Sequence, residues 1–281
     1  MSYFDKIKNK RHDRFIRQIG ISLVNFENLL QAVEKEIEAT MQKNPLKRRG
    51  KKSVMTLADR LLLTLLYLRQ YPTFERLAEQ FGISESYTCK IYHQICDILV
   101  KVLKLKNRKA LLEQPVKVIL IDVTEQPIER PTQGQKQYYS GKKKRHTIKT
   151  QLLVCFTTLT ILSVCCQKGS VHDFRILKEN RPLLHPDTIK LGDSGYQGIQ
   201  KLFANAFTPV KKKKGKSLTK EEKEYNRNLA RQRILIEHVN RRCKIFRVVK
   251  ETYRGKHKNY GKTWTIVAGI VNLRYAASPM L

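Results

Sequence analysis

The first hundred residues follow the 3.6-residue period of helices. Residues 27–41 carry apolar side chains along one face, namely Leu30, Val33, Ile37 and Met41. A second helix is predicted between Thr56 and Pro72, because Thr56 forms a capping-box-like pair with Asp59 and proline cannot continue a helix. The leucine run inside it predicts a buried helix. The N-terminal region is therefore expected to be all helical.

Residues 73–95 predict two short helices joined by a tight turn. Gly82 suits the turn, and Ser84 can cap the second helix, whose apolar side chains point inward at Ile91, Ile95 and Cys96. This layout is typical of a helix-turn-helix, and the exposed start of its second helix would present Ser86, Tyr87 and Lys90 to a DNA groove. An ordinary helical hairpin has the same pattern, so both interpretations stay open on pattern alone.

From Val116 the pattern changes to strands mixed with helices. Strands are predicted at 116–122, 146–158, 159–169, 187–193 and 207–210, and helices at 172–180 and 226–250, before a last apolar segment at 263–273. Residues 211–226 are lysine-rich without an apolar face and predict a loop or insertion. We therefore expect a helical DNA-binding region at 1–110, with its helix-turn-helix at about 56–98, and an α/β domain with a mixed central sheet at 111–281.

Charge narrows the choice of partner. The 281 residues include 56 Lys and Arg against 24 Asp and Glu, a net charge of +32. Such a chain attracts polyanions, and nucleic acid is the first candidate, with an anionic membrane or ribosomal RNA as alternatives. The start lacks the apolar segment of a secretory signal, and the longest apolar run, 152–166, is too short to span a bilayer. We expect a soluble protein of the cytoplasm.

Two predicted strands end in aspartate, at Asp122 and Asp193. If these strands are parallel neighbours, both carboxylates emerge at one edge of the sheet, where open α/β sheets bind ligands. Two adjacent carboxylates repel each other unless a divalent metal ion lies between them. The alternative is that each aspartate only begins a turn after its strand. The pair thus predicts a Mg²⁺ site, or nothing.

A third acid is available in the helix predicted at 226–250. One face carries the apolar stripe Leu235, Val239, Cys243 and Phe246, and the opposite face carries Arg233, Glu237, Asn240 and Lys244. That polar face could supply a carboxylate to a metal and two cations to phosphates. A surface helix with an ion-paired glutamate would show the same pattern, so the helix alone decides little.

Together these blocks resemble the DDE transposases, in the insertion-sequence branch related to Harbinger elements. Asp193, Gly195 and Tyr196 match the Asp-x-Gly-Tyr motif around the second acid of that family. Glu237 follows Arg233 by four residues and precedes Lys244 by seven, as in the family, and "IDVTEQPIERP" and "GSVHDFRIL" are also similar. One departure is Ala230, which stands where related signatures place a tyrosine that contacts a nucleotide.

The resemblance implies a ribonuclease-H-like fold and a catalytic triad of Asp122, Asp193 and Glu237. These acids would hold two Mg²⁺ ions, with Mn²⁺ able to substitute, for cleavage and joining of DNA. Positive side chains would contact the DNA, namely Arg233, Arg241 and Lys244 in the helix, and Lys142, Lys143, Lys144 and Arg145 in "SGKKKRH". For the latter run a solvated hairpin turn is the alternative, and His172 with Asp173 is expected to be a helix cap.

The implied partners are double-stranded DNA, both the element's terminal inverted repeats and its target, and a second copy of the chain, since two ends must be held together. No membrane partner is expected. Two rival functions remain open: a domesticated DNA-binding protein without chemistry, and a metal-dependent nuclease of the same fold that does not join strands.

Overall fold

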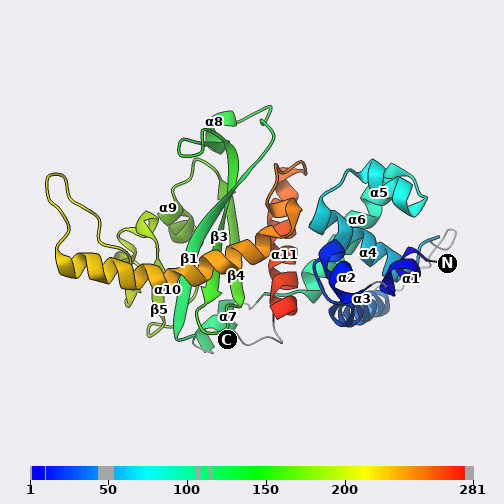
Figure 1. The fold of residues 1–281 in the computed structure, drawn as a ribbon, viewed down its shortest axis with the longest axis horizontal. Helices are drawn as coiled ribbons and strands as arrows, with labels where there is room; N and C mark the ends of the chain where they lie inside the picture. The colour runs from blue at the N-terminus through cyan, green and yellow to red at the C-terminus, as the bar shows by residue number, and fades with distance from the viewer. Residues whose placement is uncertain (1, 10, 44–53, 106–107, 114–115, 276–281) are drawn as a thin grey trace. The chain divides into compact units, whose positions relative to one another are not determined.

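The computed structural model describes residues 2–9, 11–43, 54–105, 108–113 and 116–275. The chain forms two compact units, and each is assembled from separate stretches of sequence (Figure 1). The first unit comprises the described residues among 1–104, 244–250 and 265–277, and the second those among 105–243 and 251–264. The predicted boundary near residue 110 therefore stays a prediction, because each unit includes residues from both sides of it.

The first unit is all helical, as the sequence predicts. Its helices are α1 (Tyr3–Lys8), α2 (His12–Ile19), α3 (Leu23–Lys43), α4 (Leu57–Gln70), α5 (Phe74–Phe81) and α6 (Glu85–Val102), joined by the short 3₁₀ helix η3 (Arg247–Val249) and most of α11 (Tyr260–Tyr275). Helix α4 forms the centre, since its leucines are almost completely buried. Its start is capped as expected, because the side-chain oxygen of Thr56 accepts a hydrogen bond from the backbone N–H of Asp59 at 3.1 Å.

The predicted helix-turn-helix corresponds to α5 and α6. Gly82 ends α5 in the left-handed conformation, at φ +66°, and the hydroxyl of Ser84 caps α6 by accepting from the backbone N–H of Tyr87 at 3.3 Å. Ile91 and Ile95 are fully buried. The turn and the inward face of this motif are confirmed.

The buried face of α3 differs from the predicted one. The structure buries Phe26, Leu29 and Val33, whereas Met41 is 40% exposed. The cause is the start of the helix, which lies at Leu23 rather than near residue 27 because the Ser22 hydroxyl caps it. Phe26 is thereby included, and the apolar stripe runs closer to the N-terminus of the helix.

Late segments of the chain complete the first unit. Gly269 of α11 lies so close to the end of α6 that an added Cβ would meet the Cβ of Leu103 at 2.6 Å. Arg274 donates to the backbone carbonyl of Gly20 at 2.9 Å, and Arg69 of α4 donates to the carbonyl of Ile245. The helical unit is therefore built from both ends of the sequence.

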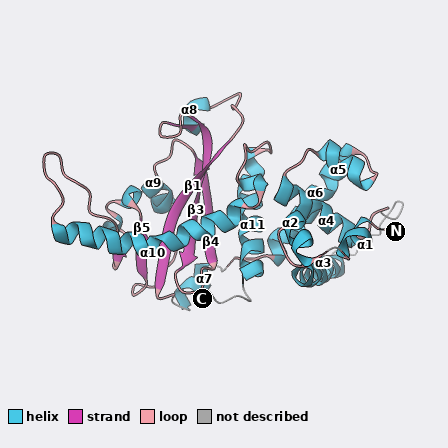
Figure 2. Cartoon of the chain, in the orientation of Figure 1, coloured by secondary structure: helices cyan, strands magenta, loops and turns pink. Residues whose placement is uncertain are grey.

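The second unit is an α/β structure around one mixed sheet (Figure 2). Its strands are β1 (Val118–Pro127), β2 (Tyr139–Ser140), β3 (Arg145–Cys155), β4 (Ile161–Lys168), β5 (Ile189–Gly192) and β6 (Ala206–Phe207). Strand β1 is central: it pairs antiparallel with β3 and parallel with β5, while β4 pairs with β3 and β6 with β5. Three antiparallel strands followed by two parallel ones confirm the ribonuclease-H-like fold.

Strand β1 is longer than the sequence predicted. It continues past Asp122 to Pro127, because it keeps pairing with β3 as far as Pro127 and Thr147. On its other side the parallel pairing with β5 stops at Ile121 and Gly192. Asp122 therefore lies within β1, at the level where its parallel neighbour ends.

Helices cover both faces of the sheet. Residues of β1 alternate between the faces, and Ile119 and Ile121 pack with α9 (Asp173–Glu179) and the 3₁₀ helices η1 (Ser194–Tyr196) and η2 (Ile199–Lys201). Asp122 points to the opposite face, where the long helix α10 (Lys220–Lys244) lies (Figure 1). The remaining short elements are α7 (Arg108–Glu113), α8 (Gln135–Tyr138) and η4 (His257–Asn259).

The bounds of α10 correct two predictions. Residues 220–226, expected to belong to a loop, already form its first turns, because Thr219 and Glu222 make a capping box with bonds of 2.9 and 3.1 Å. Its end lies at Lys244 rather than 250, since the backbone then turns into η3. Of the loop predicted at 211–226, only residues 211–219 lie outside the helix.

Within the part of the chain that the structure describes, no helix combines the length and the apolar character needed to cross a membrane.

Candidate active site

Asp122 and Asp193 leave the sheet at the same level. Ile121 and Gly192 are the last residues of β1 and β5 that pair with each other, and each aspartate directly follows its member of that pair. Asp193 caps η1, with its side-chain oxygen accepting the backbone N–H of Gly195 at 2.8 Å. The parallel arrangement expected for the two acids is confirmed, although only Asp193 ends its strand.

The environment of Asp122 opposes its negative charge. Burial raises the pKa of this carboxyl to about 6, and the nearby Asp193 carboxylate contributes to the rise. Arg233 and a hydrogen bond from Asn240 lower that pKa, but by less than burial and Asp193 raise it. The positive charge around these two neighbouring carboxylates does not neutralise them. Such a pair suits a divalent cation, whose oxygen ligands are mostly carboxylates and amides. The side chains present therefore fit a metal ion.

Helix α10 brings two polar side chains to Asp122. The amide nitrogen of Asn240 donates to the Oδ2 atom of Asp122 at 2.8 Å, and a guanidinium nitrogen of Arg233 lies 3.9 Å from Oδ1. The sequence placed both residues on a polar face opposite the apolar stripe. That face in fact points partly at the sheet, and Asn240 is only 9% exposed. The role of Asn240 was missed, because its partner lies 118 positions away in the sequence.

Glu237 lies between these two residues on the same side of α10. It follows Arg233 by one helical turn and precedes Asn240 by three residues, and its side chain is exposed. Among the described residues, no three His, Cys, Asp or Glu side chains lie close enough together to hold a metal ion. The structure thus brings Asp122 and Asp193 together and places Glu237 on the adjoining helix, and the full triad stays a prediction.

The residues that follow Asp193 shape the loop by internal packing. Tyr196 is completely buried, and its hydroxyl donates to Gln151 at 3.2 Å. A Cβ at Gly192 would lie 3.1 Å from Tyr196, and one at Gly195 would lie 2.9 Å from an Asp193 oxygen. The space beside both glycines is therefore filled by side chains of the protein, from this loop and, at Gly195, also from Asp173. Tyr196 belongs to the core.

A buried ion network lies behind the Asp193 loop. The Lys149 ammonium contacts a carboxylate oxygen of Asp173 at 2.9 Å, the carbonyl of Val171 at 2.7 Å and a carboxylate oxygen of Glu125 at 3.8 Å. The other Asp173 oxygen borders Gly195. His172 caps α9, as predicted, through its ring nitrogen. Asp173 therefore has a structural partner in Lys149 in addition to its place at the helix start.

The predicted DNA-contacting residues are mostly exposed. Ser86 and Lys90 are exposed and Tyr87 is half-buried in the first turns of α6. The exposed basic run occupies the turn from β2 into β3, namely Lys142, Lys143, Lys144 and Arg145. Arg241 is exposed on α10, and Lys244 is its last residue, half-buried and part of the first unit. Exposure is what a role in DNA binding requires, and those roles stay predictions.

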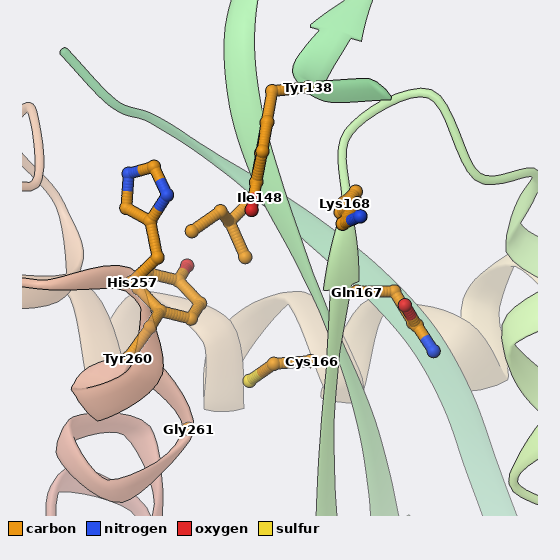
Figure 3. A pocket seen from close by; sticks show the side chains of 8 residues that line it. All are labelled: Tyr138, Ile148, Cys166, Gln167, Lys168, His257, Tyr260 and Gly261. Atoms are coloured by element: carbon orange, nitrogen blue, oxygen red, sulfur yellow. The ribbon is translucent and has the colours of Figure 1, made fainter. Parts of the chain in front are cut away.

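A separate pocket of about 150 Å³ opens beside β3 and β4 (Figure 3). It combines aromatic, basic and polar walls, formed by Tyr138, Ile148, Cys166, Gln167, Lys168, His257, Tyr260 and Gly261. The rings of Tyr138 and His257 lie 4.9 Å apart and contact each other. The pocket includes neither Asp122 nor Asp193, so the candidate chemistry belongs to the end of β5 and not to this hollow.

Comparison with known proteins agrees with this geometry. Residues 121–272 match a family model described as DDE superfamily endonuclease, and residues 53–105 match one described as helix-turn-helix of DDE superfamily endonuclease. The chain is 38% identical over 276 residues to a probable transposase for insertion sequence element IS702 from Microchaete diplosiphon, covering 97% of this chain and 98% of that protein. It is 25% identical over 207 residues to a candidate transposase for IS112 from Streptomyces albus G, covering 73% and 75%. Two carboxylates on adjacent parallel strands, a helix-turn-helix and these matches lead to one conclusion: the chain belongs to the DDE superfamily of endonucleases, as a transposase of an insertion sequence.

Proposed function

We propose that this transposase cleaves the ends of its mobile element and joins them to target DNA through a two-metal active site. The observation that supports this most is the pair Asp122 and Asp193, which directly follow the last paired residues of the β1–β5 ladder, and of which Asp193 raises the pKa of Asp122. Membership of the DDE superfamily implies dependence on a divalent metal. The identity of that metal as Mg²⁺, with Mn²⁺ able to substitute, is part of the proposal.

In this proposal Asp122, Asp193 and Glu237 hold the metal ions. Two Mg²⁺ ions bound there would supply activation of the attacking hydroxyl and stabilisation of the leaving oxygen. Glu237 projects from the side of α10 that carries the Asp122 contacts of Arg233 and Asn240, which is consistent with a ligand role for its exposed carboxylate. In addition to its contact with Asp122, Arg233 is proposed to bind a DNA phosphate near the acids.

The DNA partner is proposed to be recognised by α6. Ser86, Tyr87 and Lys90 lie in its first two turns, the part of a recognition helix that reads base edges in the major groove. The terminal inverted repeats are the specific duplex, and the net charge of +32 supports binding to target DNA without sequence preference. At least a dimer is proposed, because two ends must be held together.

Two finer assignments belong to the same proposal. The Asp193, Gly195 and Tyr196 motif supports a place in the branch related to Harbinger elements. Binding to chromosomal targets supports a location on the bacterial nucleoid.

The test uses the full chain and a DNA fragment that carries one element end. Asp122→Ala, Asp193→Ala and Glu237→Ala should each abolish Mg²⁺-dependent cleavage and joining while DNA binding persists. Glu224→Ala is the matched control, since Glu224 is an exposed acid of the same helix outside the site. Normal cleavage by any one of the three variants would remove that residue from the triad.

A second assay separates transposition from its rivals. A pre-cleaved element end is supplied together with a target plasmid and Mg²⁺. Joined products support the proposal. Cleavage without joining identifies a nuclease, and binding without either reaction identifies a DNA-binding protein that has lost its chemistry.

A further inference from the structure

We infer that Asn240 is a positioning residue that fixes the carboxylate of Asp122 for metal binding. The inference rests on the proposed function, because it takes Asp122 to be a metal ligand. It adds a residue that lies outside the predicted triad, on the same helix as Glu237 and three residues beyond it.

The contact between the two side chains is direct and buried. The Asn240 amide nitrogen donates to Oδ2 of Asp122 at 2.8 Å, and Asn240 is 9% exposed. This hydrogen bond, together with the one from the backbone N–H of Val123, holds the carboxylate in one orientation. Because ligands of metal ions are themselves oriented by such outer hydrogen bonds, this is the arrangement expected behind a metal ligand.

The donor is neutral, and this matters for the charge of the site. A lysine or arginine in place of Asn240 would neutralise the carboxylate and compete with a cation for it. The existing cation, Arg233, stays 3.9 Å from the other carboxylate oxygen, which is beyond hydrogen-bond range. Asn240 thus orients Asp122 and leaves its negative charge available.

A third observation indicates that the amide is not there for stability. The side-chain oxygen of Asn240 is buried and accepts no hydrogen bond from the described residues. A buried oxygen without a donor destabilises the fold, which offsets part of the stability that the hydrogen bond to Asp122 provides. A polar group kept at such a position is typical of functional sites.

The test measures metal binding rather than activity alone. Full-length wild type, Asn240→Leu, Asp122→Ala and Asn226→Leu are titrated with Mn²⁺, and free Mn²⁺ is followed by electron paramagnetic resonance. Asn226 is the matched control, because it lies on α10 and hydrogen-bonds the backbone of Val210 at 2.8 and 3.0 Å. Leucine has the branched shape and the same number of side-chain non-hydrogen atoms as asparagine, although it is larger, and it lacks the donor. Melting temperatures are recorded in EDTA for all four proteins.

We expect Asn240→Leu to weaken Mn²⁺ binding by about 10- to 100-fold. Its metal-free melting temperature should stay close to that of wild type, because loss of the hydrogen bond to Asp122 is offset by removal of the unpaired amide oxygen. The Mg²⁺ concentration for half-maximal cleavage should rise by a similar factor, while the rate at saturating Mg²⁺ stays near wild type. Asn226→Leu should bind Mn²⁺ like wild type, and Asp122→Ala should lose the binding.

Two results would overturn the inference. Wild-type Mn²⁺ affinity in Asn240→Leu, together with loss of binding in Asp122→Ala, would reject the positioning role and leave the proposed function standing. Weaker binding accompanied by loss of the cooperative metal-free melting transition would assign Asn240 a structural role instead. Unchanged binding in Asp122→Ala is a different failure, since it contradicts the proposed function itself.

Discussion

Ile121 of β1 and Gly192 of β5 form the last paired step of the parallel ladder in the catalytic sheet. The two strands stop pairing with each other after this step, and each has an aspartate at the next position. The backbone register of the two strands therefore brings Asp122 and Asp193 together. No rearrangement of side chains is needed for this. This backbone arrangement makes the two acids the most firmly positioned part of the site.

The raised pKa of Asp122 predicts a pH-dependent stability in the absence of metal. Its folded-state pKa of about 6 exceeds the ordinary value, so the fold favours the neutral carboxyl. That contribution is complete below about pH 4 and is lost as the pH rises through 6. Asp122→Asn should therefore gain stability over wild type in EDTA, by up to about 3 kcal/mol at pH 8 but only about 1 kcal/mol at pH 4.5. Urea unfolding at both pH values measures the difference.

The control for this experiment is Glu224→Gln, because Glu224 is an exposed acid of α10. Its effect on stability at pH 8 should be much smaller than that of Asp122→Asn. An equal difference from wild type at both pH values for Asp122→Asn would show that the Asp122 carboxyl does not titrate as described.

Gly195→Ala should disturb the site without unfolding the protein. The added Cβ would lie 2.9 Å from an Asp193 oxygen and 3.0 Å from an Asp173 oxygen, so both carboxylates must move. A shift of a catalytic group by about 1 Å can cost on the order of 100-fold in rate. Cleavage should fall by about that factor while the circular dichroism spectrum stays unchanged. Gly141→Ala, where nothing lies within 4 Å, should cleave like wild type.

Lys149→Met should destabilise the catalytic unit strongly. The side chains of Lys149 and Glu125 are 11% and 10% exposed, and that of Asp173 is 26% exposed. Removing one partner of a buried ion pair leaves charge without compensation and costs about 3 to 5 kcal/mol. Urea unfolding measures this loss. Lys168→Met replaces an exposed lysine on the neighbouring strand and should change stability by no more than about 0.5 kcal/mol. Equal effects would contradict the structural role of the network.

The exposed basic turn predicts a specific salt dependence. Lys142, Lys143, Lys144 and Arg145 are replaced together by Gln, and the matched control replaces Lys211, Lys212, Lys213 and Lys214, which removes the same charge from residues that are also exposed. If the turn binds phosphates, the slope of log K against log salt should decrease in magnitude by about 0.9 for each phosphate that the variant no longer neutralises. The control should change the slope less. Equal slopes would assign the turn to solvent.

Local signals predicted much of the fold. The caps at Thr56 and Ser84 and the turn at Gly82 depend on neighbouring residues only, and all three were predicted from sequence. The capping box of Thr219 and Glu222 was equally local. The start of α10 was nevertheless predicted too late, because the lysine-rich sequence around it indicated a loop. The end of β1 could not be predicted in this way, because it depends on how far β3 continues to pair.

In the candidate site, too, features that depend on neighbouring residues were predicted, and contacts between distant residues were not. Asp122 and Asp193 were predicted because each follows an apolar strand, a pattern visible in a single sequence. The contacts of Asn240 with Asp122, and of Lys149 with Asp173, join residues on different elements and depend on packing that no local pattern reports. Glu237 was selected by resemblance, and its exposed position on α10 neither adds to that argument nor removes it.

The approach of Gly269 to Leu103 has a consequence for how the protein is made. Domains generally fold as the chain leaves the ribosome, N-terminal parts first. Here the helical unit that holds the helix-turn-helix includes most of α11, which is synthesised after all strands of the sheet. A ribosome that stops before α11 would release a chain whose helical unit lacks one of its core helices. We therefore expect such a truncated chain to bind DNA less well than a chain that includes α11.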